Sequence, residues 1–206
     1  MSVKDKRQGR TIPEQEGRRT MRKITVTKFG LLAGGLMFAG GLMFAGGTQE
    51  EDPPSLAQVV ALDECDPATF NAPTAVGPDF CKNVALGAST KFADLFAKAA
   101  HGTPDPNWDF EPDAMIVKKG TVLSAVNQGG EPHTFTEVAR FGGGFLGPLN
   151  GGEETVPECA GGFSRVEVAK TRILQGSQLQ ITGLSKGEHL FQCCIHPWMR
   201  TKVEVK

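Results

Sequence analysis

The chain has 206 residues, enough for one domain with appendages, and its formal net charge is −1. Its 26 glycines and 13 prolines favour a turn-rich β protein over a helical one. The charge is divided unevenly, because residues 1–47 carry +6 and residues 48–206 carry −7. The acidic part has no electrostatic reason to bind nucleic acid and is expected to attract basic protein partners.

The first 47 residues predict an export signal. A basic region is followed by residues 29–47, which read FGLLAGGLMFAGGLMFAGG. A basic start, an apolar stretch and small residues at its end are typical of a secretory signal, and cleavage after Gly47 suits this pattern. An uncleaved membrane anchor is the alternative. Arg18 and Arg19 resemble a twin-arginine signal, unless translation starts at Met21. We expect an exported protein, in the periplasm or at the extracellular face of a bacterial membrane.

Residues 48–107 are expected to form a linker and an N-terminal extension. The acidic, proline-containing start indicates disorder. One helix is predicted from Ser89 to Ala100, because Phe92, Leu95, Phe96 and Ala99 share one face. His101 follows this helix, where the helix dipole favours a partly charged imidazole, so we do not assign it to a metal.

Residues 108–206 read as one domain of short strands separated by glycine-rich turns. Such strands predict an antiparallel sandwich or barrel. A glycine-rich loop at residues 141–162 is long enough to suggest a functional or disulfide-tethered role. The predicted strands cover residues 115–117, 122–126, 173–174, 178–184, 189–193 and 202–206.

The segment Phe191-Gln192-Cys193-Cys194-Ile195-His196-Pro197-Trp198-Met199 contains the donors of a metal site. A thiolate, an imidazole and a thioether suit copper, which must be bound as both Cu(I) and Cu(II) during electron transfer. His133, in the sequence GEPHTF, can supply the second imidazole from a neighbouring strand. Cys194 points away from Cys193 on an extended strand, and His189 lies too far from Cys193 to join the same ion.

This loop resembles that of the plastocyanin/azurin family of blue-copper proteins (cupredoxins), and the form Cys-x-x-His-Pro-x-Met is similar to amicyanins in length. The resemblance covers residues 108–206. It implies a cupredoxin-like antiparallel Greek-key β-sandwich with one type 1 copper. His133, Cys193, His196 and Met199 would be the ligands, and His196 would be the ligand nearest to solvent.

Two features depart from the family. Thr134 stands where amicyanin-like proteins have an Asn that braces the ligand loop, and its hydroxyl can take the same part next to the ligands. The segment between His133 and Cys193 is also longer than in the compact members. Phe191 shares the face of Cys193 and is expected in the core beside the site. Pro197 and Trp198 would form a docking patch, although Trp198 can also be an ordinary packing residue.

The four cysteines other than Cys193 allow three disulfide pairings, which fits an oxidising compartment. We expect Cys65–Cys81 in the extension and Cys159–Cys194 tying the glycine-rich loop to the copper strand. Free thiols are the alternative.

The leading functional hypothesis is electron transfer by a monomeric Cu(II)/Cu(I) carrier that serves redox protein partners. Copper binding for storage or delivery is the alternative, although methionine- or histidine-rich runs are absent. Four histidines without a His-x-His pair exclude the trinuclear cluster of a multicopper oxidase, and we expect no enzyme activity. An open copper site remains conceivable if Met199 swings away. Zinc is disfavoured because its structural sites recruit four Cys or His ligands.

Overall fold

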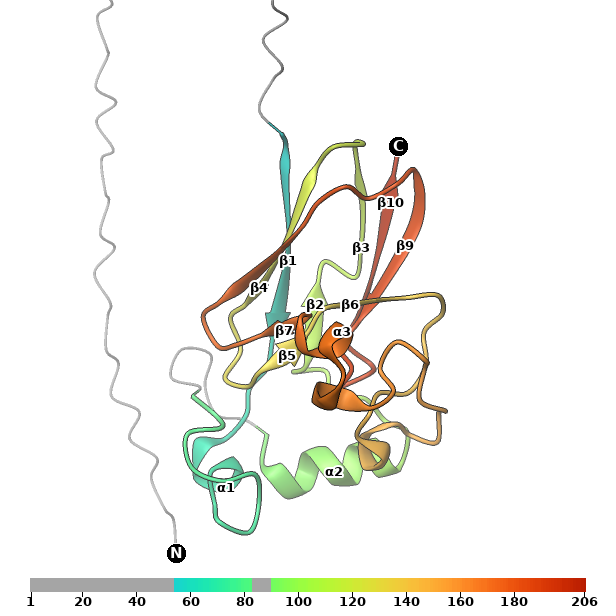
Figure 1. The fold of residues 1–206 in the computed structure, drawn as a ribbon. Helices are drawn as coiled ribbons and strands as arrows, with labels where there is room; N and C mark the ends of the chain where they lie inside the picture. The colour runs from blue at the N-terminus through green and yellow to red at the C-terminus, as the bar shows by residue number, and fades with distance from the viewer. Residues whose placement is uncertain (1–53, 83–89) are drawn as a thin grey trace, which may run out of the picture. The chain divides into compact units, whose positions relative to one another are not determined.

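Two four-stranded sheets and one two-stranded sheet form the fold in residues 54–82 and 90–206, the part of the chain described by this computed structural model (Figure 1). The predicted export signal, residues 1–47, lies outside the described residues. Within the described ranges, no helix combines the length and the apolar character needed to cross a membrane.

The first sheet has the strand order β2-β1-β4-β8. Strand β1 (Leu56–Leu62) is parallel to β4 (Val122–Asn127) and antiparallel to β2 (Asp109–Glu111). Strand β8 (Gln178–Ile181) is antiparallel to β4 at the edge of the sheet.

The second sheet has the order β3-β10-β9-β6. Strand β10 (Arg200–Val205) is parallel to β3 (Ala114–Val117) and antiparallel to β9 (Gly187–Gln192), which pairs with β6 (Thr136–Val138). A short antiparallel pair joins β5 (His133–Thr134) to β7 (Arg172–Ile173), with His133 opposite Ile173.

Side chains of both sheets meet in one core. In β10 the residues alternate, so that Thr201, Val203 and Val205 are buried while the residues between them are exposed. Phe191 of β9 stacks on Phe135 with a centroid distance of 4.5 Å. The core also contains Val59, Ala61, Phe110, Leu123 and Ile173.

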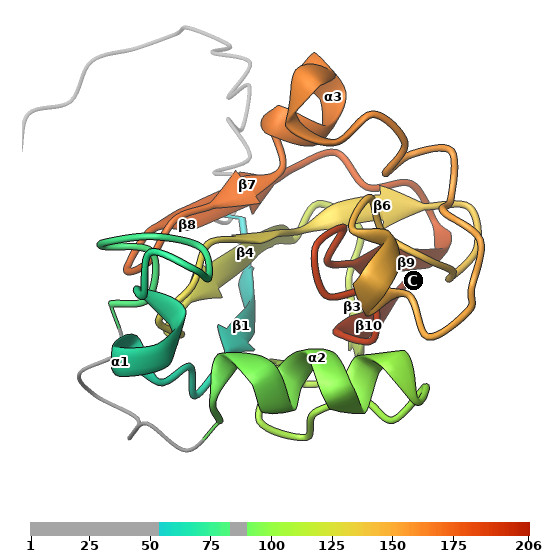
Figure 2. The ribbon, with the colours of Figure 1, turned by 90° about the horizontal axis from the view of Figure 1, so that it is seen from below.

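Two of the helices lie at one end of the sandwich. Helix α2 (Phe92–Ala100) runs across this end beside the short α1 (Pro67–Phe70), as Figure 2 shows. Leu95 and Ala99 are its buried residues, on the face predicted from the sequence, and the exposed His101 caps its C-terminal end as expected. The predicted start, Ser89, lies outside the described residues. A third helix, α3 (Val166–Ala169), and the 3-10 turns η1 (Gly147–Leu149) and η2 (Gly162–Ser164) interrupt the long connection from β6 to β7.

The organisation differs from the sequence-based expectation in two respects. Strand β1 falls in the region assigned to a linker and an extension, yet it pairs on both sides within a sheet of the sandwich. Its side chains Val59 and Ala61 are fully buried, and this burial explains the pairing. The sheets are also not purely antiparallel, because β1–β4 and β3–β10 are parallel pairs.

Both expected disulfides are present. Cys65 is bonded to Cys81 and Cys159 to Cys194, and Cys193 remains a free, buried thiol. The second bond fixes the glycine-rich loop directly beside Cys193. It closes a loop with a sequence separation of 35, and such closure stabilises a fold mainly by restricting the unfolded chain.

Candidate metal centre

The loop from Cys193 to Met199 connects β9 to β10 and is closed by its own backbone. The Cys193 N–H donates to the Met199 carbonyl at 3.0 Å, and the Met199 N–H donates to the His196 carbonyl at 3.0 Å. The Phe145 N–H donates to the Cys194 carbonyl at 2.9 Å and joins the loop to the glycine-rich segment. A methyl group on Gly144 would overlap the Cys194 backbone, so this approach requires glycine.

Strand β5 places His133 opposite this loop. Thr134 links the two segments, because its Oγ1 accepts a hydrogen bond of 2.7 Å from the Cys194 N–H. The Thr134 N–H in turn lies 3.5 Å from Cys193 Sγ. Thr134 therefore braces the ligand loop, as the sequence analysis expected of its hydroxyl.

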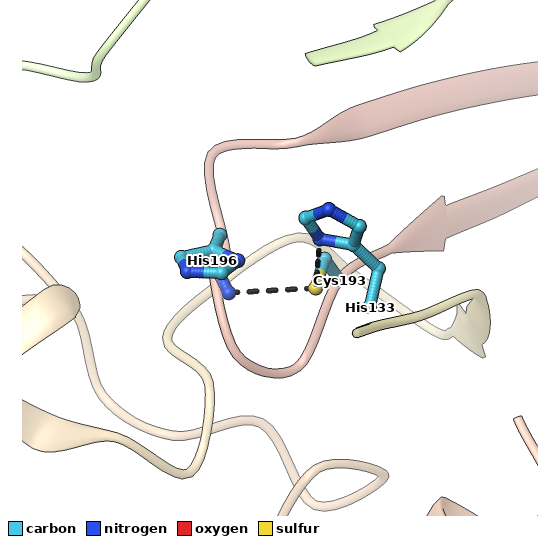
Figure 3. Close-up of side chains that lie close together, drawn as sticks. All are labelled: His133, Cys193 and His196. Atoms are coloured by element: carbon cyan, nitrogen blue, oxygen red, sulfur yellow. Dashed lines mark hydrogen bonds between the residues drawn. The ribbon is translucent and has the colours of Figure 1, made fainter. Parts of the chain in front are cut away.

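Three donor atoms of His133, Cys193 and His196 converge within 4.8 Å of one another. His133 Nδ1 lies 3.8 Å from Cys193 Sγ, and a dashed line marks this contact in Figure 3. Bonds from imidazole nitrogen and thiolate sulfur to a metal such as zinc are about 2.0 and 2.3 Å long, so two ligands of one ion lie up to about 4.3 Å apart. The separation of these two atoms therefore suits a shared ion.

The surroundings of Cys193 lower the pKa of its thiol, which favours metal binding. Burial alone would raise its pKa, but interactions with the nearby His133 and His196 outweigh burial and lower the pKa well below its usual value. The His196 N–H also points at the sulfur, at 3.5 Å. Burial lowers the pKa of His133, whereas its contacts with Asp63 and Cys193 raise it to about 10.

The Nδ1 atom of His196 has no hydrogen-bond partner among the described residues, although it is buried. Buried polar atoms in folded proteins are almost always paired, so an unpaired nitrogen beside a thiolate requires an explanation. A metal ion held by Nδ1 supplies one. The combination of two imidazoles with one thiolate is a donor set that copper prefers.

Met199 is fully buried in the same core cluster as Cys193. Its backbone closes the ligand loop at both ends, as described above. The structure thus places the predicted fourth ligand at the base of the loop, and its bond to a metal remains a prediction. Phe191, expected beside the site, is buried in the stack with Phe135.

Two buried carboxylates behind the imidazoles were not predicted. His133 Nε2 lies 2.9 Å from Asp63 Oδ2, and His196 Nε2 lies 3.1 Å from Glu131 Oε2. Trp108 Nε1 donates to the same oxygen of Glu131 at 3.4 Å. Asp63 directly follows β1, and Glu131 stands two residues before His133, within the quoted motif. The only sequence signal for these two carboxylates was their position, Asp63 at the end of a strand and Glu131 within the motif of a ligand.

The expected docking residues line a hollow, and their part in docking remains a prediction. Pro197 is buried and Trp198 is half-buried, and both lie between the C-terminal end of α2 and residues 149–153. His196 is 2% exposed, whereas the other three predicted ligands are 0% exposed. A different, apolar groove reaches His196. It is lined by Phe92, Phe96, Phe145, Leu146, Phe163 and His196, among others.

The other two histidines lie outside the cluster. His189 forms an ion pair with Glu137, with His189 Nδ1 2.7 Å from Glu137 Oε1, and His101 is exposed at the end of α2. Both placements agree with the sequence analysis, which assigned neither residue to the metal. Among the described residues, His133, Cys193 and His196 are the one cluster of at least three such side chains able to share an ion.

The strand order and this cluster together define the class of protein. The sandwich has two four-stranded sheets. The Cys–His–Met loop joins β9 to β10 of the second sheet and lies opposite His133 on the short strand β5. The chain has a cupredoxin-like fold, a β-sandwich with a short helix at the site end.

Known proteins were compared with this chain in sequence and structure. No known family pattern and no curated protein matches the sequence. A purple cupredoxin from Nitrosopumilus maritimus is similar in structure, with 13% identity, coverage of 73% of this chain and 99% of that chain, and a TM-score of 0.37. An amicyanin from Paracoccus versutus has 18% identity, covers 48% and 73% of the two chains, and has a TM-score of 0.31. The assignment of the class therefore depends on this chain's own strand order and site.

Proposed function

We propose that the cluster binds one copper ion as a type 1 centre and that the protein carries single electrons between redox partners. When bound, copper would supply the Cu(II)/Cu(I) couple. His133, Cys193 and His196 would be its three strong ligands, and Met199 a fourth, weaker ligand. The convergence of these three buried donors, with His196 Nδ1 otherwise unpaired, is the observation that supports the proposal.

The residues around the cluster favour a rigid site. Backbone hydrogen bonds close the loop from Cys193 to Met199, Thr134 braces it, and the Cys159–Cys194 disulfide anchors it. A carrier benefits from such rigidity, because ligands that stay in place let the metal change charge with little rearrangement. The protein would thus supply orientation and tuning.

Storage or delivery of copper is the alternative. A delivery site must release its ion to a partner, which requires ligands that an incoming donor can reach. Here His133 and Cys193 are 0% exposed and His196 is 2% exposed. This burial favours retention of the ion and hence a carrier.

The visible spectrum separates these functions. Cu(II) added to the wild-type protein should produce an intense blue colour through charge transfer from Cys193, and ascorbate should bleach it reversibly. Cys193→Ser should remove the colour. The double variant Cys159→Ser/Cys194→Ser should retain it, because it removes the disulfide but no ligand. Circular dichroism checks that each variant is folded. Colourless copper binding by the wild type would contradict the carrier and favour delivery.

The redox partners are proposed to be proteins with a basic surface. The balance of −7 in residues 48–206 supports this choice, because complementary charge steers association. Such a partner would contact the apolar groove beside His196, where the imidazole comes closest to the surface.

An extracytoplasmic location is also proposed. Two disulfides support it, because disulfides persist mainly in oxidising compartments. Fractionation of producing cells checks this proposal, and recovery of the protein in the cytoplasm with reduced cysteines would contradict it.

A further inference from the structure

Each candidate imidazole ligand contacts a buried carboxylate with its outer nitrogen. An ionised carboxylate only accepts hydrogen bonds, so His133 donates from Nε2 to Asp63 and His196 donates from Nε2 to Glu131. With the proton on Nε2, the lone pair of each ring is on Nδ1. His133 Nδ1 faces Cys193 Sγ, and His196 Nδ1 is the unpaired buried nitrogen. The carboxylates therefore select the tautomer that binds a metal through Nδ1.

Asp63 is itself held firmly. Its Oδ2 accepts the Glu131 N–H at 2.9 Å in addition to His133, and its Oδ1 accepts the Cys65 N–H at 3.2 Å. Gly129 packs against the carboxylate so closely that a methyl group there would overlap it.

Glu131 is fixed in a similar way. Its side chain is 2% exposed and receives the Trp108 indole N–H, while its carbonyl accepts a hydrogen bond of 2.6 Å from Asn127 Nδ2. Because the Glu131 N–H donates to Asp63, the two carboxylates and the two imidazoles form one connected network. Such a network holds its members in a single arrangement.

We propose that Asp63 and Glu131 are positioning residues that orient the two imidazoles and lower the reduction potential of the centre. The inference rests on the proposed function. Two negative charges behind the ligands stabilise Cu(II) more than Cu(I), because the oxidised ion has the larger positive charge. Their burial keeps this interaction from being screened by water and salt.

The reduction potential of the copper-loaded protein tests the inference. Asp63→Asn and Glu131→Gln preserve shape and remove one charge each. We expect each variant to prefer Cu(II) over Cu(I) about tenfold less than the wild type, which equals a potential higher by about 59 mV for a one-electron couple. The potential of the double variant should be higher still. Trp108→Phe should move the potential in the opposite direction, because the Glu131 carboxylate loses a donor that withdraws its charge.

Asp105→Asn is the matched control. Asp105 is as buried as Glu131, but it pairs with Lys98 at 2.9 Å and contacts no imidazole, so its loss should leave the potential nearly unchanged. Blue variants at Asp63 and Glu131 with the wild-type potential would overturn the inference and leave the proposed function intact. A wild-type protein without a blue centre would instead overturn the proposed function. If either single variant fails to fold, the sign of the Trp108→Phe change still decides the matter.

Discussion

At the scale of residues, the centre is a set of buried charges that compensate one another. His133 and His196 lower the pKa of Cys193, and the contacts of the two imidazoles with Cys193, Asp63 and Glu131 raise their own pKa values. Burial opposes charge on each of these groups, and their mutual contacts outweigh it. The donors thus lie together before an ion binds, and binding would require them in their deprotonated form.

The ion pair between His189 and Glu137 lies on the surface and gives a prediction about the pH dependence of stability. Hydrogen bonds to Glu137 and to the Ser185 carbonyl outweigh burial and raise the pKa of His189. A group whose pKa is raised in the folded state stabilises the fold fully at pH values below its unfolded-state pKa, which is about 6.5 for histidine. This stabilisation is lost as the pH rises through the folded-state pKa. Glu137→Gln should therefore lower the free energy of unfolding more at pH 5.5 than at pH 9, by up to about 1 kcal/mol.

Urea denaturation of the wild type and the variant at both pH values measures this difference. Glu188→Gln is the control, because Glu188 is an exposed neighbour on the same strand and points to the other face. Its effect should not depend on pH over this range. An equal loss of stability for Glu137→Gln at pH 5.5 and pH 9 would contradict the assigned role of His189.

The sequence predicted the converging donors but not the carboxylates behind them. Cys193, His196 and Met199 lie at fixed short spacings in one loop, so their shared chemistry is visible locally. Asp63 meets His133 across a separation of 70 residues, and nothing local distinguishes it from a surface acid. Glu131 is close to His133 in sequence, but its contact is with His196 on another element.

At the scale of elements, alternation and turns predicted six strands after residue 108, whereas β1, β2 and β6 were missed. The acidic, proline-containing residues before β1 suggested a linker, and the boundary was placed too late. Pairing with β4 requires knowledge of a partner 66 residues away, which the local sequence pattern does not contain. Helix α2 was predicted because its apolar face repeats within the segment itself.

The glycine-rich connection between β6 and β7 is an element whose role was only suspected. The structure fixes it to the ligand loop through the Cys159–Cys194 disulfide and through Gln192, whose side chain bonds both the N–H and the carbonyl of Gly142. Through these contacts the long loop packs against the ligand loop and forms one side of the site. The even number of remaining cysteines indicated disulfides but allowed three pairings, and the backbone contacts depend on side-chain placement.

At the scale of the whole described molecule, helices and long loops surround the site and leave the apolar groove as the surface next to His196. Leu146, which is 37% exposed, lies on this groove. Two copies of a carrier that exchange electrons directly must bring such surfaces together. A charge placed there should oppose that contact.

Electron self-exchange between oxidised and reduced copper-loaded protein, measured by NMR line broadening, tests this docking surface. Leu146→Glu should slow the exchange at least about tenfold at low salt, with partial recovery at high salt, because like charges repel and salt screens them. Ile116→Glu is the control, because Ile116 is 67% exposed on β3 and does not line the groove. Equal slowing by both variants would show that the groove is not the contact surface.

The central claim is that sulfur from Cys193 and nitrogen from His133 and His196 bind the same ion. X-ray absorption at the copper edge of the loaded protein measures this directly. The account predicts one short copper–sulfur bond and two copper–nitrogen bonds, with the sulfur contribution lost in Cys193→Ser. A spectrum of copper bound by nitrogen and oxygen alone in the wild-type protein would contradict it.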